Sequence, residues 1–186
     1  MTRARDLMEK LIAFPTVSTE SNLALIDFVE SYLADLGVAS TRVPDATGQK
    51  ASLYAHIGPQ VAGGVVLSGH TDVVPVDGQD WATDPFVLTE RDGRLYGRGS
   101  SDMKGFIACV LAVIPGVARQ GLRTPVHLAF SYDEEVGCIG VGRLIEVLDA
   151  DVVSEAAAAV SALRVTVPAP TVTVTGEDGA GVLCIT

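Results

Sequence analysis

Residues 65–72 read Val-Val-Leu-Ser-Gly-His-Thr-Asp, an apolar run that ends abruptly in polar residues. A short apolar run bounded by turn residues is typical of a buried strand. A second strand is predicted over residues 126–132, and it runs into the acidic stretch 133–135. Apolar residues before, between and after these strands recur at helical spacing. Helices and strands therefore alternate along the chain, which favours an α/β layered fold.

Apolar spacing and turn residues predict the remaining elements. Helices are expected over residues 7–14, 21–37, 102–119 and 139–148, and strands over 38–43, 51–57, 86–89 and 94–96. Asp92-Gly93 is a strong hairpin signal between the last two strands. Ser100 and Ser101 are expected to open the third helix, and Pro115 to kink or shorten it.

Composition narrows the class of protein. The chain has 186 residues, enough for one domain, and is 48% hydrophobic and 19% charged, which favours a globular protein over a disordered one. Its net charge of -10 argues against a nucleic-acid or anionic-membrane partner. Three cysteines without a CxxC pair indicate a reducing compartment. No segment approaches the run of about 20 apolar residues of a transmembrane helix. We therefore expect a cytoplasmic protein.

The first polar cluster with chemical potential is His70-Thr71-Asp72. It follows a buried strand, so we expect it at the carboxyl edge of a sheet, where ligand sites of α/β proteins gather. Side chains two apart on an extended chain point the same way. Asp72 can therefore lie beside His70, orient its imidazole and raise its basicity.

Two further clusters carry carboxylates. Asp102 lies in a glycine-rich segment where a helix is expected to begin, and a carboxylate can bridge two metal ions. Glu134 and Glu135 follow a strand, where one can bind a metal while the other acts as a general base. Each cluster alone is weak evidence for a metal site. Together, at strand ends and a helix start in an apolar setting, they favour a metallohydrolase site over three unrelated polar loops.

Two segments carry a family resemblance: residues 69–106, GHTDVVPVDGQDWATDPFVLTERDGRLYGRGSSDMKGF, and residues 131–145, SYDEEVGCIGVGRLI. These segments resemble the di-zinc aminoacylase and exopeptidase family. The similarity is greatest to the branch that holds acetylornithine deacetylase and succinyl-diaminopimelate desuccinylase, and within it to acetylornithine deacetylase. It implies a zinc-exopeptidase-like catalytic domain with a mixed central sheet.

The resemblance also implies roles for five residues. His70 would bind one zinc ion, Asp102 would bridge two, Glu135 would bind the other, Asp72 would orient His70, and Glu134 would be the general base. Two zinc ions are implied, with cobalt as a possible substitute, and the substrate would be a small N-acyl amino acid. The implied reaction is removal of the acetyl group from N-acetyl-L-ornithine in arginine biosynthesis. Desuccinylase or dipeptidase activity, and a catalytically dead metal-binding fragment, remain alternatives.

The chain departs from the family pattern beyond the glutamate pair. The family has a further acidic ligand about 25 residues on, and neither Glu155 nor Glu177 has the expected neighbours. A C-terminal histidine ligand is also missing, as is the inserted lid domain that usually supplies homodimer contacts. We divide the chain into residues 1–150, the N-terminal part of a catalytic domain truncated before the lid, and an Ala/Val/Thr-rich tail, 151–186. The tail is expected to reflect a frameshifted or prematurely ended reading, a naturally short family member being one alternative. In the other alternative, a helix over residues 154–164 and a strand over 171–176 close the domain. The activity of this chain alone is expected to be impaired.

Overall fold

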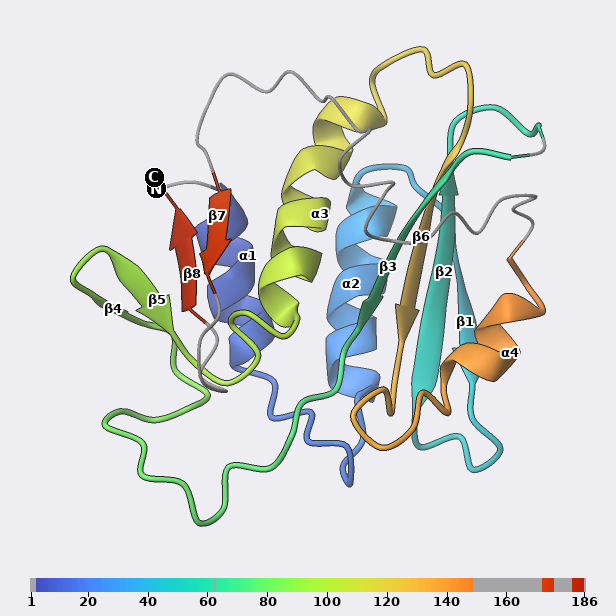
Figure 1. The fold of residues 1–186 in the computed structure, drawn as a ribbon. Coiled ribbons are helices and arrows are strands. Elements are labelled where there is room, and N and C mark those ends of the chain that lie inside the picture. The colour runs from blue at the N-terminus through green and yellow to red at the C-terminus, as the bar shows by residue number, and fades with distance from the viewer. Residues whose placement is uncertain (1–2, 62, 149–171, 176–181, 186) are drawn as a thin grey trace.

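The computed structural model describes residues 3–61, 63–148, 172–175 and 182–185. The described strands form two four-stranded sheets. The larger sheet has the order β1-β2-β6-β3, and its strands are β1 (Ser40–Pro44), β2 (Ala51–Ile57), β6 (Val126–Ser131) and β3 (Val65–His70). β2 pairs antiparallel with β1 and with β6, whereas β3 and β6 are parallel (Figure 1). The expected α/β class with a mixed central sheet is confirmed.

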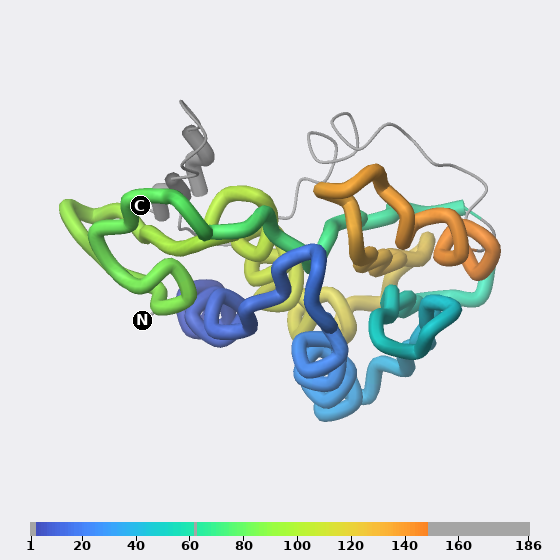
Figure 2. The backbone as a smooth tube through the Cα atoms, turned by 90° about the horizontal axis from the view of Figure 1, so that it is seen from below, coloured from blue at the N-terminus to red at the C-terminus, as the bar shows by residue number. Residues whose placement is uncertain are grey.

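Helices cover both faces of this sheet (Figures 1 and 2). They are α1 (Arg3–Ile12), α2 (Leu23–Asp35), α3 (Lys104–Val117) and the short α4 (Val141–Ile145). α2 and α3 pack on one face, and α4 contacts β2 and β6 from the other. Apolar residues of α1, α2 and α3 bury against β2, β3 and β6 and form the core. Among the described residues, no helix is long and apolar enough to cross a membrane.

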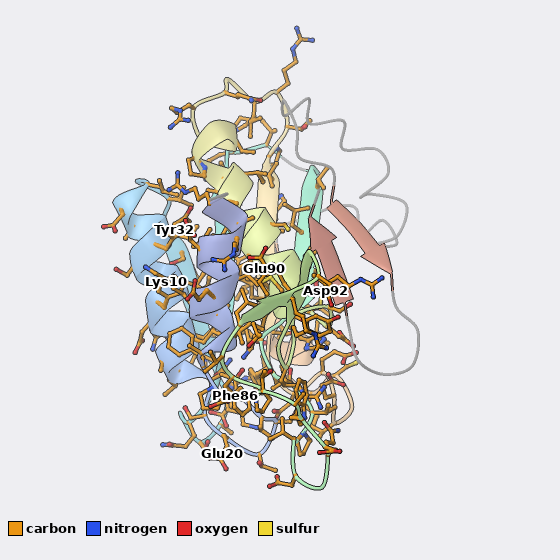
Figure 3. The ribbon with its side chains drawn as sticks, turned by 90° about the vertical axis from the view of Figure 1, so that its left-hand side faces the viewer. Lys10, Glu20, Tyr32, Phe86, Glu90 and Asp92 are labelled. Atoms are coloured by element: carbon orange, nitrogen blue, oxygen red, sulfur yellow. The ribbon has the colours of Figure 1, made fainter. Side chains whose placement is uncertain are left out.

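The smaller sheet has the order β4-β5-β8-β7. Its strands are β4 (Thr89–Arg91), β5 (Arg94–Tyr96), β8 (Val182–Ile185) and β7 (Val172–Thr175). Asp92 and Gly93 both adopt positive φ, 53° and 71°, at the tip of the β4–β5 hairpin, where Figure 3 labels Asp92. A two-residue turn of this kind matches the twist of the flanking strands. The predicted hairpin is therefore present, and the strand expected near residues 171–176 coincides with β7.

Several predicted boundaries were wrong. The first helix covers Arg3–Ile12 rather than 7–14. The first hairpin strand covers Thr89–Arg91 rather than 86–89, because the backbone N–H of Val87 bonds the Asp84 carbonyl in a turn. The third helix begins at Lys104 rather than at 102, and its N-cap is Met103 with no side-chain cap hydrogen bond, so the serines do not cap it. The fourth helix covers five residues instead of 139–148. Its start is delayed because the backbone N–H groups of Gly137 and Gly140 bond back to Glu134 and Tyr132 in a tight turn. Apolar spacing cannot reveal such loop hydrogen bonds.

Several expectations about the tail lie outside the described residues. These are the helix expected over 154–164 and the candidate acidic residues Glu155 and Glu177. The proposed division at residue 150 also falls in this part of the chain. All of them stay predictions.

Pro115 lies inside α3 without ending it. A proline has no N–H to donate to the carbonyl four residues earlier, here that of Leu111. The hydroxyl of Tyr32, labelled in Figure 3, donates to this carbonyl at 2.9 Å. A side chain of α2 thus satisfies the backbone group that the proline leaves open, and it ties the two helices together.

We expect Tyr32→Phe to lower the free energy of unfolding by about 0.5–1.5 kcal/mol, the usual net worth of one hydrogen bond. In a Pro115→Ala background the new backbone N–H at position 115 can bond the Leu111 carbonyl, so Tyr32→Phe should cost less there. Urea unfolding of the four proteins in the double-mutant cycle measures both costs. An equal cost in the two backgrounds would contradict this account.

Candidate metal centre

The three polar clusters meet at one end of the larger sheet. β3 and β6 run parallel and in register, so that His70 at the end of β3 pairs with Ser131 at the end of β6. Both strands reach the lower end of the sheet in Figure 1, and Figure 2 views the molecule from that end. The glutamates that follow β6 therefore lie at the same edge as His70. The predicted gathering at the carboxyl edge is present.

The imidazole of His70 is buried, with 4% of the residue exposed. Its Nδ1 lies 2.9 Å from the backbone carbonyl oxygen of Asp72 and 3.4 Å from Asp72 Oδ1. A carbonyl oxygen can only accept, so Nδ1 carries a proton and Nε2 is the atom turned toward the other carboxylates. Nε2 is 3.0 Å from Oδ1 of Asp102 and 3.8 Å from Oε2 of Glu134.

These contacts form a cluster of possible metal ligands. One ligand atom each from His70, Glu134 and Glu135 lie within 4.8 Å of one another. Asp102 adjoins this group through its contact with His70, and its peptide bond to Met103 is cis. One imidazole nitrogen and carboxylate oxygens are a donor set that suits zinc. The residues present therefore fit the metal that the sequence predicts.

Asp72 lies beneath the cluster and is 2% exposed. Its carboxylate accepts hydrogen bonds from the Ser18 hydroxyl at 2.6 Å and from the backbone N–H groups of Glu134 at 3.1 Å and Glu135 at 3.3 Å. Burial would raise the pKa of Asp72, but the hydrogen bonds from His70, Ser18 and Glu134 outweigh it and lower the pKa to about 2. Asp72 is thus ionised and joins the histidine to the glutamate loop.

The charges of the cluster residues shift one another's pKa values. Burial would lower the pKa of His70, but hydrogen bonds with Asp72 and Asp102 and the charge of Asp72 raise it to about 9. Burial raises the pKa of Glu135, and the neighbouring charges of Asp102 and Glu134 raise it further. Carboxylates packed this closely repel one another unless a cation lies among them. The chemistry of the cluster therefore favours a bound cation.

A cavity of about 140 Å³ opens beside the cluster. It is lined by Val74, Trp81, Tyr96, Gly97, Arg98, Gly99, Ser100, Ser101, Asp102 and Glu135. The guanidinium of Arg98 lies 5.0 Å from the centre of the Trp81 ring and donates to the side chain of Gln79. Burial lowers the pKa of Arg98, and the charge of Glu135 opposes this. The wall of the cavity therefore carries a cation whose charge interacts with that of Glu135.

The five predicted site residues are thus brought together, and their individual roles remain predictions. Ser18, which the sequence does not single out, also reaches the site. Ser18 bonds Asp72, and the fully buried Lys104 donates from Nζ to the Phe14 carbonyl at 2.5 Å. Burial lowers the pKa of Lys104 to about 7. The role of Ser18 cannot be recognised from sequence alone, because its partner is 54 residues away.

The two other histidines lie in strands, as expected, and take part in local contacts. His127 Nδ1 accepts from the Tyr54 hydroxyl at 2.8 Å, and its Nε2 lies 3.1 Å from the Gly63 carbonyl oxygen. His56 Nε2 lies 3.0 Å from the Pro59 carbonyl oxygen. Both rings therefore have hydrogen-bond partners away from the cluster.

Comparisons with known proteins agree with the fold. The family model described as peptidase family M20/M25/M40 matches residues 66–182. Acetylornithine deacetylase of Shigella sonnei (strain Ss046) is 41% identical over 149 residues, which cover 76% of this chain and 38% of that protein. Among solved structures, an M20 family metallo-carboxypeptidase from Sulfolobus solfataricus is similar with a TM-score of 0.68 at 26% identity, covering 78% of this chain and 34% of that one. Human carnosine dipeptidase 1 is similar with a TM-score of 0.64 at 27% identity, covering 77% and 34%.

The chain belongs to peptidase family M20/M25/M40. Within that family it is similar to proteins named acetylornithine deacetylase. It spans 38% of the length of the curated relatives that it matches. The similarity therefore covers only part of a whole acetylornithine deacetylase and does not by itself assign the activity, substrate or partners of that protein to this chain.

Proposed function

We propose that this chain carries the metal-binding part of a zinc-dependent amidohydrolase that removes the acetyl group from N-acetyl-L-ornithine. The observation that carries the proposal is the cluster in which donor atoms of His70, Glu134 and Glu135 lie within 4.8 Å of one another. Asp102, 3.0 Å from His70, extends this donor set. The 41% identity to acetylornithine deacetylases supports the choice of substrate.

The roles of the residues follow from their positions. His70, Asp102 and Glu135 would hold the metal, and Asp72 would fix the imidazole through its carbonyl and carboxylate oxygens. Zinc in such a site supplies Lewis-acid chemistry toward an amide carbonyl. Of the two glutamates, Glu134 is the more exposed, with 44% of its side chain accessible, so water can reach its carboxylate. It would take the proton of the attacking water and return it to the leaving amine nitrogen.

The size of the cavity beside the cluster favours a substrate with a small acyl group. Its volume of about 140 Å³ leaves room for a few non-hydrogen atoms next to Asp102 and Glu135. Trp81 and Val74 supply apolar surface, and Arg98 supplies a cation for an oxygen of the substrate. The described residues supply three of the five zinc ligands that the resemblance implies, so we expect this chain alone to turn over slowly. A homodimer remains a prediction from the same resemblance.

Dipeptide hydrolysis is the second candidate. The chain is 27% identical to human carnosine dipeptidase 1 over the similar part of the fold. The purified chain, supplied with zinc or cobalt, should be assayed on N-acetyl-L-ornithine, N-succinyl-diaminopimelate and a dipeptide. Preference for the acetylated substrate supports the proposal. Preference for either of the other two substrates would contradict the proposal and assign desuccinylase or dipeptidase activity instead. Zinc binding without turnover of any substrate would indicate a catalytically dead fragment.

Asp72→Ala tests the link between His70 and the glutamate loop. The substitution removes the carboxylate that contacts the imidazole and accepts both glutamate N–H groups. We expect zinc affinity to fall by about 10–100-fold, as for other partners that orient a metal-bound histidine. Isothermal titration with zinc measures the change, and Asp77→Ala, at an exposed aspartate in the following loop, is the control. An unchanged affinity in Asp72→Ala would show that the aspartate does not support the site.

A further inference from the structure

The loop that carries Glu134 and Glu135 is held from two sides. From one side, the carboxylate of Asp72 accepts both of their backbone N–H groups. From the other side, the ammonium of Lys50 donates to Oδ1 of Asp133 at 2.5 Å. Asp133 directly precedes the glutamates, so the ion pair acts on the same short stretch of backbone.

Lys50 links a third segment to this loop. Its Nζ also donates to the backbone carbonyl of Ser18 at 2.5 Å, in the loop between α1 and α2. The hydroxyl of Ser18 in turn donates to Asp72. The contacts therefore close a ring that runs through Ser18, Lys50, Asp133, the glutamate backbone and Asp72. Figure 2 shows the loops after α1, β1 and β6 together at this end of the sheet.

The ion pair within the ring is well shielded from solvent. The side chains of Lys50 and Asp133 are 16% and 13% exposed, whereas the pair between Arg42 and Asp27 leaves 33% and 63% exposed. A shielded pair is screened less by salt and is held more firmly than an exposed one. Asp133 also adopts a φ of 54°, in the left-handed region, where the chain turns out of β6 toward the site. The ion pair therefore holds the residue at which the backbone changes direction.

We propose that Lys50 is a positioning residue: through Asp133 it fixes the backbone of Glu134 and Glu135 at the candidate metal centre. Its ammonium bonds Ser18 and Asp133 rather than either glutamate side chain, so it acts through the ring. Its effect on the backbone follows from the contacts themselves, and its effect on metal binding rests on the proposed function. Lys50 lies just before β2, 83 residues from Asp133, in a segment that no motif marks.

Amide hydrogen exchange of the metal-free 186-residue chain tests the proposal directly. Lys50→Met keeps a long apolar stem but removes the charge, and Asp133→Asn keeps the side-chain shape and its tolerance of positive φ. In both variants we expect the amides of Glu134 and Glu135 to exchange about tenfold faster or more, while the amides of Val29 and Leu33 in α2 keep their rates. Lys50→Arg should restore slow exchange. Arg42→Met, which removes a more exposed ion pair, should leave the glutamate amides unchanged.

Zinc titration of the same proteins provides the second measurement. We expect Lys50→Met and Asp133→Asn to weaken zinc binding by about tenfold, and the double variant to weaken it no further, because the two residues act through one contact. Unchanged exchange of the glutamate amides, or equal acceleration of every amide, would overturn the proposal, as would unchanged zinc affinity beside faster exchange. If the unsubstituted chain binds no zinc, the proposed function fails, whereas the exchange data still decide whether Lys50 fixes the loop.

Discussion

Glu134→Gln is expected to reduce hydrolysis of N-acetyl-L-ornithine by about 10²–10⁴-fold, the usual contribution of a general acid–base group. The glutamine has nearly the same shape but cannot take up the proton of the attacking water. Zinc affinity should change little, because His70, Asp102 and Glu135 keep their donor atoms. Steady-state rates and zinc titration on the same preparation separate the two effects.

The matched control is Glu20→Gln, which alters an exposed glutamate of the α1–α2 loop, labelled in Figure 3. It should leave both rate and zinc affinity unchanged. If instead Glu135→Gln abolishes turnover with zinc retained, and Glu134→Gln weakens zinc binding, the roles of the two glutamates are exchanged. A pure metal-binding module would show no effect of Glu134→Gln on any measured property.

His70→Ala is expected to weaken zinc binding by more than about 100-fold, beyond the range for residues that only orient a ligand. His70 supplies the imidazole nitrogen of the cluster, and its Nε2 faces Asp102 and Glu134 at 3.0 and 3.8 Å. Without this nitrogen, only carboxylates that repel one another remain, and they bind zinc more weakly. Isothermal titration with zinc, at a pH where the chain is fully folded, gives the ratio of affinities.

His56→Gln is the matched control because His56 bonds the Pro59 carbonyl instead of approaching the cluster. It should bind zinc as tightly as the unsubstituted chain. Equal zinc affinities for His70→Ala and the unsubstituted chain would show that His70 is not a ligand. Equal losses in His70→Ala and His56→Gln would indicate a general loss of folded protein.

The sequence predicts much of the fold because its signals are local. The apolar run at residues 65–70 and the Asp92-Gly93 turn are each encoded by adjacent residues, and both elements are present. The gathering of His70 with Glu134 and Glu135 also follows from sequence, since both segments come directly after strands. One geometric rule, that parallel strands end at the same edge, is enough to bring them together.

Other parts of the site depend on contacts between distant segments. Lys50 and Asp133 are 83 residues apart, and Ser18 and Asp72 are 54 apart. Each residue alone resembles an ordinary polar loop residue, so neither pair can be recognised without the fold. The delayed start of α4 has a similar origin, because the backbone bond from Gly140 to Tyr132 competes with helix formation. Local spacing carries no information about that competition.

The proposed zinc site consists of His70 at the end of β3, Asp102 before α3 and Glu135 after β6. Zinc X-ray absorption of the loaded 186-residue chain tests it most directly, because scattering distances identify the donor atoms. The account predicts nitrogen and oxygen neighbours at about 2.0–2.2 Å, an imidazole contribution that disappears in His70→Ala, and no sulfur. Sulfur neighbours at about 2.3 Å, or an imidazole signal that survives His70→Ala, would contradict it.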